Sequence, residues 1–195
     1  RTPDELLALF RSQFALYDLW RVGIVWNRLG HVSRGRLRGD AVQDLVEHTI
    51  DTLPSCNARA AASILHGAAK AGLRARDAAA LYEAGEAAAR RVMREMAPQE
   101  LSNTAWAFAT AEQPAPALFD ALARESVAKA GAFRHPQDIS NTAWAFAKAE
   151  QPAPALFDAL AVQAVPMLGD FRPQAISSTA WAFASAEHAA PALFD

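Results

Sequence analysis

A 22-residue stretch decides the fold: LSNTAWAFATAEQPAPALFDAL at Leu101–Leu122. Ile139–Leu160 repeats it as ISNTAWAFAKAEQPAPALFDAL, with 20 of 22 positions identical. A third copy, ISSTAWAFASAEHAAPALFD, covers Ile176–Asp195. Repetition at this period is typical of stacked structural repeats. The register is marked by tryptophans spaced 38 and 37 residues apart, Trp106, Trp144 and Trp181.

Prolines at matching positions divide each copy into two predicted helices. Proline is favoured at the first position of a helix and cannot continue a helix that has already begun. The first helices are therefore predicted to begin at Pro98, Pro136 and Pro173 and to end near Glu112, Glu150 and Glu187. The second helices are predicted to begin at Pro116, Pro154 and Pro191, and the first two of them are expected to end near Gly131 and Gly169.

Weaker copies precede the clear ones. His66 takes the tryptophan position in a degenerate unit, and Trp26 takes it in the most divergent one. Further helices are predicted over 2–29, 39–53, 56–72 and 76–96. Alanine, the strongest helix former, supplies 47 of the 195 residues. The sequence thus predicts an all-α fold, an α-solenoid of about five stacked helix pairs with a 37–40 residue period.

The whole chain, residues 1–195, is expected to form one domain. Its predicted units are a degenerate N-terminal unit at 1–55, a second degenerate unit at 56–97, clear repeats at 98–135 and 136–172, and an incomplete repeat at 173–195. Because solenoids need polar capping units, we expect the chain to be part of a longer array.

Composition, charge and the lack of known motifs exclude several classes of function. The net charge is −2, which excludes a chain-wide basic field, although residues 1–95 carry 14 basic and 11 acidic side chains against 5 and 10 in residues 96–195. A single cysteine, Cys56, excludes a disulfide framework and a multi-cysteine metal site. No run of 18 apolar residues is present, so no membrane insertion is expected. The five scattered histidines form no recognisable catalytic or metal motif, and we expect no enzyme activity, no cofactor and no small-molecule substrate.

Helical spacing separates a predicted core from a predicted surface. The residues expected in the repeat core are Trp106, Trp144, Trp181, Phe108, Phe146 and Phe183. For the tryptophans, base stacking is the alternative to core packing. A polar stripe lies at i, i+4, i+8 and i+11 of each first helix, with a small central residue such as Ala107 or Ala145 that would form a groove floor.

That stripe is the candidate binding surface, and its alternative is an ordinary solvated helix face. Its members are Ser63, Lys70, Asn103, Thr110, Asn141, Lys148, Ser178 and Ser185. Thr110 and Lys148 differ between two nearly identical repeats, as unit-by-unit reading of a ligand would require. A second candidate is the glycine-punctuated loop 31–40, where Arg34, Arg36 and Arg38 could contact phosphates.

The motif PQELSNTAWAFA and its copies resemble the octotricopeptide repeat, a helical-pair family related to the arrays of RAP-domain and FAST-kinase-like organelle proteins. The resemblance is strong over Pro98–Asp195 and weakens towards the N-terminus. It implies an α-solenoid in a mitochondrion or chloroplast that binds single-stranded or structured organellar RNA through its first helices, in transcript processing, stability or translation. The alternative is a non-catalytic scaffold subunit of a large organellar assembly such as a ribosome, with other protein subunits as partners. The acidic C-terminal half favours this alternative.

Overall fold

The computed structural model describes residues 2–12, 19–33, 37 and 40–194, and these form helices and connecting turns without a strand. The α-helices are α1 (Pro3–Ser12), α2 (Leu19–Val32), α3 (Asp40–Thr52), α4 (Ala58–Lys70), α5 (Ala75–Val92), α6 (Pro98–Ala111), α7 (Pro116–Ala128), α8 (Pro136–Lys148), α9 (Pro154–Ala164), α10 (Pro173–Ser185) and α11 (Pro191–Phe194). Short 3-10 turns follow several of them: η2 (Leu53–Ser55), η3 (Met93–Glu95), η4 (Ala130–Ala132) and η5 (Val165–Asp170).

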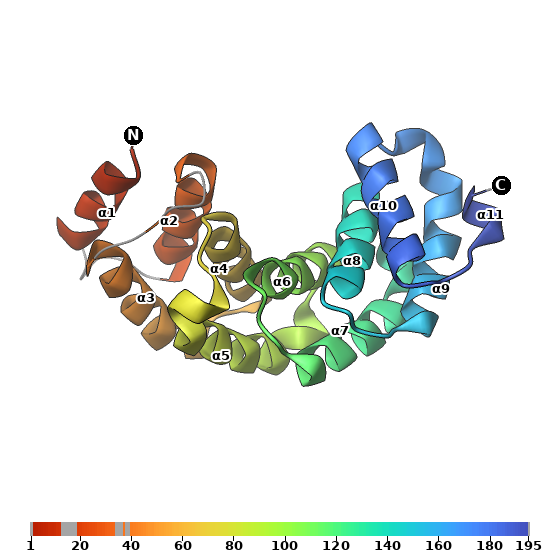
Figure 1. Ribbon diagram of the computed structural model, residues 1–195. Coiled ribbons are helices and arrows are strands. Elements are labelled where there is room, and N and C mark those ends of the chain that lie inside the picture. Colours follow the sequence, from red (N-terminus) through yellow and green to blue (C-terminus); the bar gives the residue numbers. More distant parts are fainter. Residues whose placement is uncertain (1, 13–18, 34–36, 38–39, 195) are drawn as a thin grey trace.

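The helices form two layers of an arch (Figure 1). The first helices of the pairs, α2, α4, α6, α8 and α10, line its concave side, and the second helices α3, α5, α7 and α9 cover the convex side. The predicted all-α solenoid of stacked pairs is confirmed. Residues 2–29, which read as one helical pattern, contain two helices instead, because α1 packs beside α2 and α3.

The helices of the clear repeats begin at prolines, and each first helix is followed by a residue in the left-handed backbone conformation. The clear repeats begin their helices at the predicted prolines, from Pro98 to Pro191. The second helices α7 and α9 end at Ala128 and Ala164, shortly before the predicted glycines, and Gly131 and Gly169 lie in the 3-10 turns that follow. The left-handed residue falls after the first helix and is a glutamate in each clear repeat: Glu112, Glu150 and Glu187, with φ of 59°, 53° and 51°.

Small residues let the first helices pack closely side by side. A Cβ atom added to Gly67 of α4 would lie 2.8 Å from the backbone carbonyl carbon of Trp26 in α2. The corresponding residues Ala107, Ala145 and Ala182 are completely buried. The second helices make far fewer contacts with one another than the first helices do. The inner layer is therefore tighter than the outer layer, which curves the array around the first helices.

Paired rings fill the core between successive units. Phe146 of α8 meets Phe119 of α7 edge to face, with ring centroids 5.0 Å apart, and Phe183 meets Phe157 at the same distance. In the earlier joint Phe108 packs against Tyr82 at 5.7 Å. All three phenylalanines of the first helices are buried. Each aromatic pair fixes how one unit follows the last, because edge-to-face rings prefer one relative orientation.

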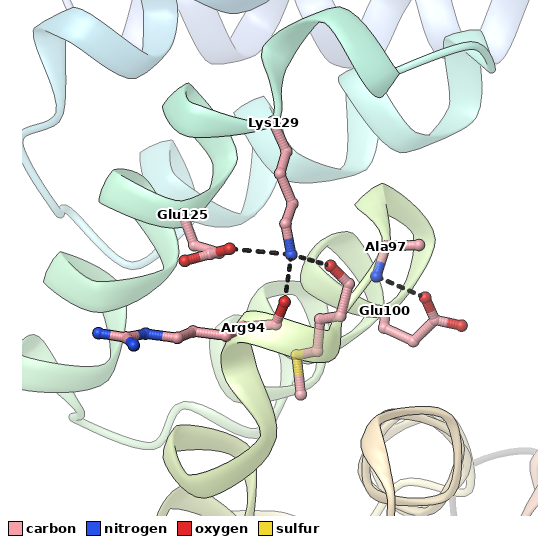
Figure 2. Close-up of polar contacts among 6 residues, drawn as sticks. Arg94, Ala97, Glu100, Glu125 and Lys129 are labelled. Atoms are coloured by element: carbon pink, nitrogen blue, oxygen red, sulfur yellow. Dashed lines mark hydrogen bonds and ion pairs between the residues drawn. The ribbon is translucent and has the colours of Figure 1, made fainter.

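A cation at the end of a second helix closes the turn of the unit before it (Figure 2). Lys129 donates through Nζ to the carbonyl oxygens of Arg94 and Met96, at 2.8 and 2.7 Å, and forms an ion pair with Glu125. Arg91 donates in the same way to the carbonyl of Cys56. Helix α6 begins beside this contact, where the Glu100 carboxylate accepts from the backbone N–H of Ala97 at 3.0 Å.

The tight inner layer predicts a large effect for the smallest possible substitution. Gly67→Ala gains helix propensity but places its methyl group against the backbone of α2, which cannot rotate away. We expect the free energy of unfolding to fall by about 1–3 kcal/mol, as overpacking does in a tight core. Urea denaturation measures this change. Gly131→Ala is the control, because a Cβ at Gly131 meets no atom within 4 Å. Equal stability of the two variants would contradict the close approach.

Candidate functional site

Three rows of side chains run along the concave face, across the first helices. They occupy positions i, i+3 and i+7 of each helix and therefore share one face. In α6 they are Asn103, Trp106 and Thr110. The equivalent triplets are Ser63, His66 and Lys70 in α4; Asn141, Trp144 and Lys148 in α8; and Ser178, Trp181 and Ser185 in α10. We call these the polar row, the aromatic row and the variable row.

The aromatic row corrects the prediction that the tryptophans are buried. Trp106 and Trp144 are only partly buried, and Trp181 is 44% exposed. The rings follow one another across the joints: His66 to Trp106 at 4.8 Å between centroids, Trp106 to Trp144 at 6.3 Å, and Trp144 to Trp181 at 6.4 Å. Each tryptophan thus bridges two units, as expected, but presents part of its ring to solvent.

The predicted groove floor is also corrected. Ala107 and Ala145 are completely buried between neighbouring first helices, so they cannot be reached by a ligand. Their small size serves helix packing. The exposed centre of the face is the aromatic row, one residue earlier in each helix.

The predicted polar residues share the face but differ in access. Lys148 and Ser185 are exposed, whereas Ser63, Asn103, Asn141 and Ser178 are half-buried. The amide oxygen of Asn141 accepts from Gln137 at 2.7 Å. The hydroxyl of Thr110 is buried without a hydrogen-bond partner, so it does not point outward as a donor. The carbonyl of Thr110 accepts from Arg74.

The first unit joins the rows in a register that the sequence did not predict. Trp26 is completely buried and donates to the Thr49 hydroxyl at 2.8 Å, so it lies outside the aromatic row. His31 of α2 instead lies beside Lys70, whose Nζ is 3.4 Å from His31 Nε2. His31 extends the variable row, and Asn27, one turn earlier, extends the aromatic row. The sequence of this unit is too divergent to show the alignment, which the contact between His31 and Lys70 reveals.

The other candidate groups form no second site among the described residues. Arg34, Arg36 and Arg38 lie outside the described residues. Burial raises the pKa of the Cys56 thiol to about 11, against the opposing effect of Arg91. Burial raises the pKa of Asp138 too. Within the described residues, no group of three or more histidine, cysteine or acidic side chains could hold a metal ion. No helix in that part of the chain is long and apolar enough to cross a membrane.

The concave face can therefore bind by stacking and hydrogen bonding. Half-exposed indoles offer flat apolar surfaces, amides and hydroxyls flank them on one side, and Lys70 and Lys148 add positive charge on the other. None of the residues in the three rows is acidic. An extended polymer with flat rings and an anionic backbone fits such a face.

The fold defines this chain as a helical-repeat protein, an α-solenoid whose concave face carries the three rows. A sequence model of one family, described as RNA-editing substrate-binding complex 6 protein, matches residues 11–195. The chain belongs to that family. The family description does not name the octotricopeptide-repeat or RAP-domain proteins that the motif resembles. A comparison with curated proteins found no match.

His66 makes the stability of the array depend on pH. Burial lowers the pKa of His66 to about 4 from 6.5, helped by Lys70 and His31. The folded chain therefore keeps His66 neutral where the unfolded chain protonates it. The contribution of neutral His66 to the free energy of unfolding is full above pH 6.5 and is lost as the pH falls towards 4. We expect a loss of roughly 1–2 kcal/mol between pH 7 and pH 5.

His66→Phe isolates this effect, because phenylalanine keeps a ring in the aromatic row and cannot titrate. Urea denaturation of both proteins at pH 7 and pH 5 gives the difference, and the other titratable groups, Asp138 included, cancel in it. The pH dependence should be smaller in the variant. If stability depends on pH equally in both proteins, His66 is protonated at pH 5 in the folded chain as it is in the unfolded chain, and its pKa is not lowered.

Proposed function

We propose that this chain is a non-catalytic subunit of an organellar RNA-editing or RNA-processing complex and binds single-stranded RNA along its concave face. The observation that carries the proposal is the aromatic row, whose half-exposed indoles are flanked by hydrogen-bonding side chains and by lysines. Bases stack on such rings at about 1–3 kcal/mol each. The family description, which names a substrate-binding complex of RNA editing, supports RNA as the polymer and other subunits as partners.

Each row has a separate part in this proposal. The indoles stack on bases. The amides and hydroxyls of the polar row, above all Asn103 and Asn141, contact base edges. In the variable row, the lysines contact the RNA backbone, whereas Thr110 and Ser185 offer no charge to it. Helical repeats that read RNA use side chains in this way, one base per repeat.

The organellar location rests on the resemblance to organelle repeat proteins, and the family description fits RNA processing there. Nothing in that description supports a chloroplast. The scaffold function named above is favoured only by the acidic C-terminal half, and it becomes the conclusion if the concave face does not bind RNA.

Substitutions in the three rows should have different effects on RNA binding. Trp181→Ala removes the most exposed indole and should weaken binding about 10-fold, the lower part of the stacking range. Lys148→Ala should reduce the slope of log affinity against log salt by about 0.7 for single strands. Asn141→Ala should change the preference for one base by about 1 kcal/mol. Fluorescence anisotropy with labelled homopolymeric RNAs over a range of salt concentrations measures all three.

Arg124→Ala is the matched control for Lys148→Ala, because Arg124 is an exposed cation of α7 in the convex layer. It should leave the salt slope unchanged. If all of the row variants fold and bind RNA as the wild type does, the concave face is a solvated surface and the scaffold function replaces RNA binding.

A further inference from the structure

A cavity opens at the joint between α2 and α4, at the N-terminal end of the concave face. Its volume is about 320 Å³, close to the lower limit for small-molecule sites. Helix α2 lines it with Gly23, Ile24 and Asn27, and Arg59 and Ser63 of α4 line the other side. Ser63 belongs to the polar row and Asn27 extends the aromatic row, so the cavity lies on the path proposed for RNA.

Gly23 leaves this space open although helix packing does not require a glycine there. A Cβ at Gly23 would lie 3.7 Å from the Ser63 hydroxyl oxygen and 3.8 Å from Ile64 Cγ1, which are ordinary contacts. The residues in the same position of the next three first helices are larger and buried: Ala62, Ser102 and Ser140. The residue at this position is therefore smallest in α2, where the cavity opens.

The lining combines one apolar wall with several polar groups. Ile24 is 43% exposed and supplies the apolar wall. The Asn27 amide and the Ser63 hydroxyl can each donate and accept hydrogen bonds. The Arg59 guanidinium is a planar cation that suits both a phosphate and the face of a base. None of the lining residues is acidic.

A cationic contact continues from the cavity along the same face. Lys70 lies two helical turns after Ser63, about 10 Å further along α4. Its Nζ lies 3.4 Å from His31 Nε2 and 3.5 Å from Nδ1. Lys70 therefore places a positive charge beside His31 on this end of the concave face, where it can attract a phosphate.

We infer that the cavity holds one nucleotide of a bound single-stranded RNA. Its base lies against Ile24, with its edge hydrogen-bonded by Asn27 and Ser63. Arg59 contacts its phosphate, and Lys70 contacts the phosphate of a neighbouring nucleotide. This inference rests on the proposed function for the polymer, but it assigns a bounded site with its own ligand, a single nucleotide.

Gly23→Leu tests the site by filling it, with Gly23→Ala as the matched control that adds only a tolerated methyl group. Binding of single-stranded RNA is measured by fluorescence anisotropy, and binding of the four nucleoside 5′-monophosphates by ligand-observed NMR. Gly23→Leu should weaken RNA binding at least 10-fold and abolish the monophosphate signal. Gly23→Ala should stay within about twofold of the wild type. If Gly23→Leu does not fold, Asn27→Leu covers the mouth of the cavity instead, with Ala80→Leu on the outer helix α5 as its control.

The outcomes separate the two proposals. If the wild type binds RNA and the filled variant binds it equally well, the nucleotide site is wrong and the proposed function stands. If the wild type does not bind RNA, the proposed function fails. The nucleotide site is then tested by the binding of the monophosphates alone. A monophosphate signal that is lost in Gly23→Leu keeps the nucleotide site, and no signal in the wild type overturns it.

Discussion

The close approach of neighbouring first helices is the constraint on which the rest of the molecule depends. Gly67 cannot carry a side chain without meeting the backbone of α2, and the alanines in its place in later units are completely buried. Larger residues would separate the inner helices, flatten the arch and pull apart the rings of the aromatic row. The alanine-rich composition thus has a geometric purpose beyond helix propensity: it makes the inner layer narrower than the outer one.

Because the first helices lie close together and side by side, residues that recur in the sequence also recur at regular places on the concave surface. A residue that recurs at one position of every unit forms a line across the concave face, so three positions are enough to make three rows. Two rows keep their chemistry through the clear repeats. The variable row does not, since it reads His31, Lys70, Thr110, Lys148 and Ser185. Differences between units therefore appear on one line of the surface, where a bound polymer would meet them in order.

The sequence predicted the period, the helix starts and the all-α class because prolines and repeated letters record them directly. It misplaced the tryptophans because the run AWAFA is apolar at every position, and apolar character alone cannot tell which residue faces a neighbouring helix and which faces solvent. A shift of one residue, about 100° around the helix, exchanged Ala107 and Trp106 between surface and interior. The left-handed glutamates were missed for a different reason: glycine is the expected residue at such a position.

The cavity at the first joint could not be predicted at all, because it depends on which residues of α2 and α4 lie opposite one another. In these degenerate units Trp26 suggested a register that the contact between His31 and Lys70 corrects. The cavity also bears on how a chain of net charge −2 could bind an anionic polymer. Residues 1–95 have a basic excess and residues 96–195 an acidic one, so attraction to phosphates is greater in the N-terminal half of the chain. The indole rings belong to the C-terminal repeats, where Trp106, Trp144 and Trp181 take the position that His66 and Asn27 hold before them. Binding along this face would therefore change in kind along the array, from contacts with phosphates at one end to stacking at the other.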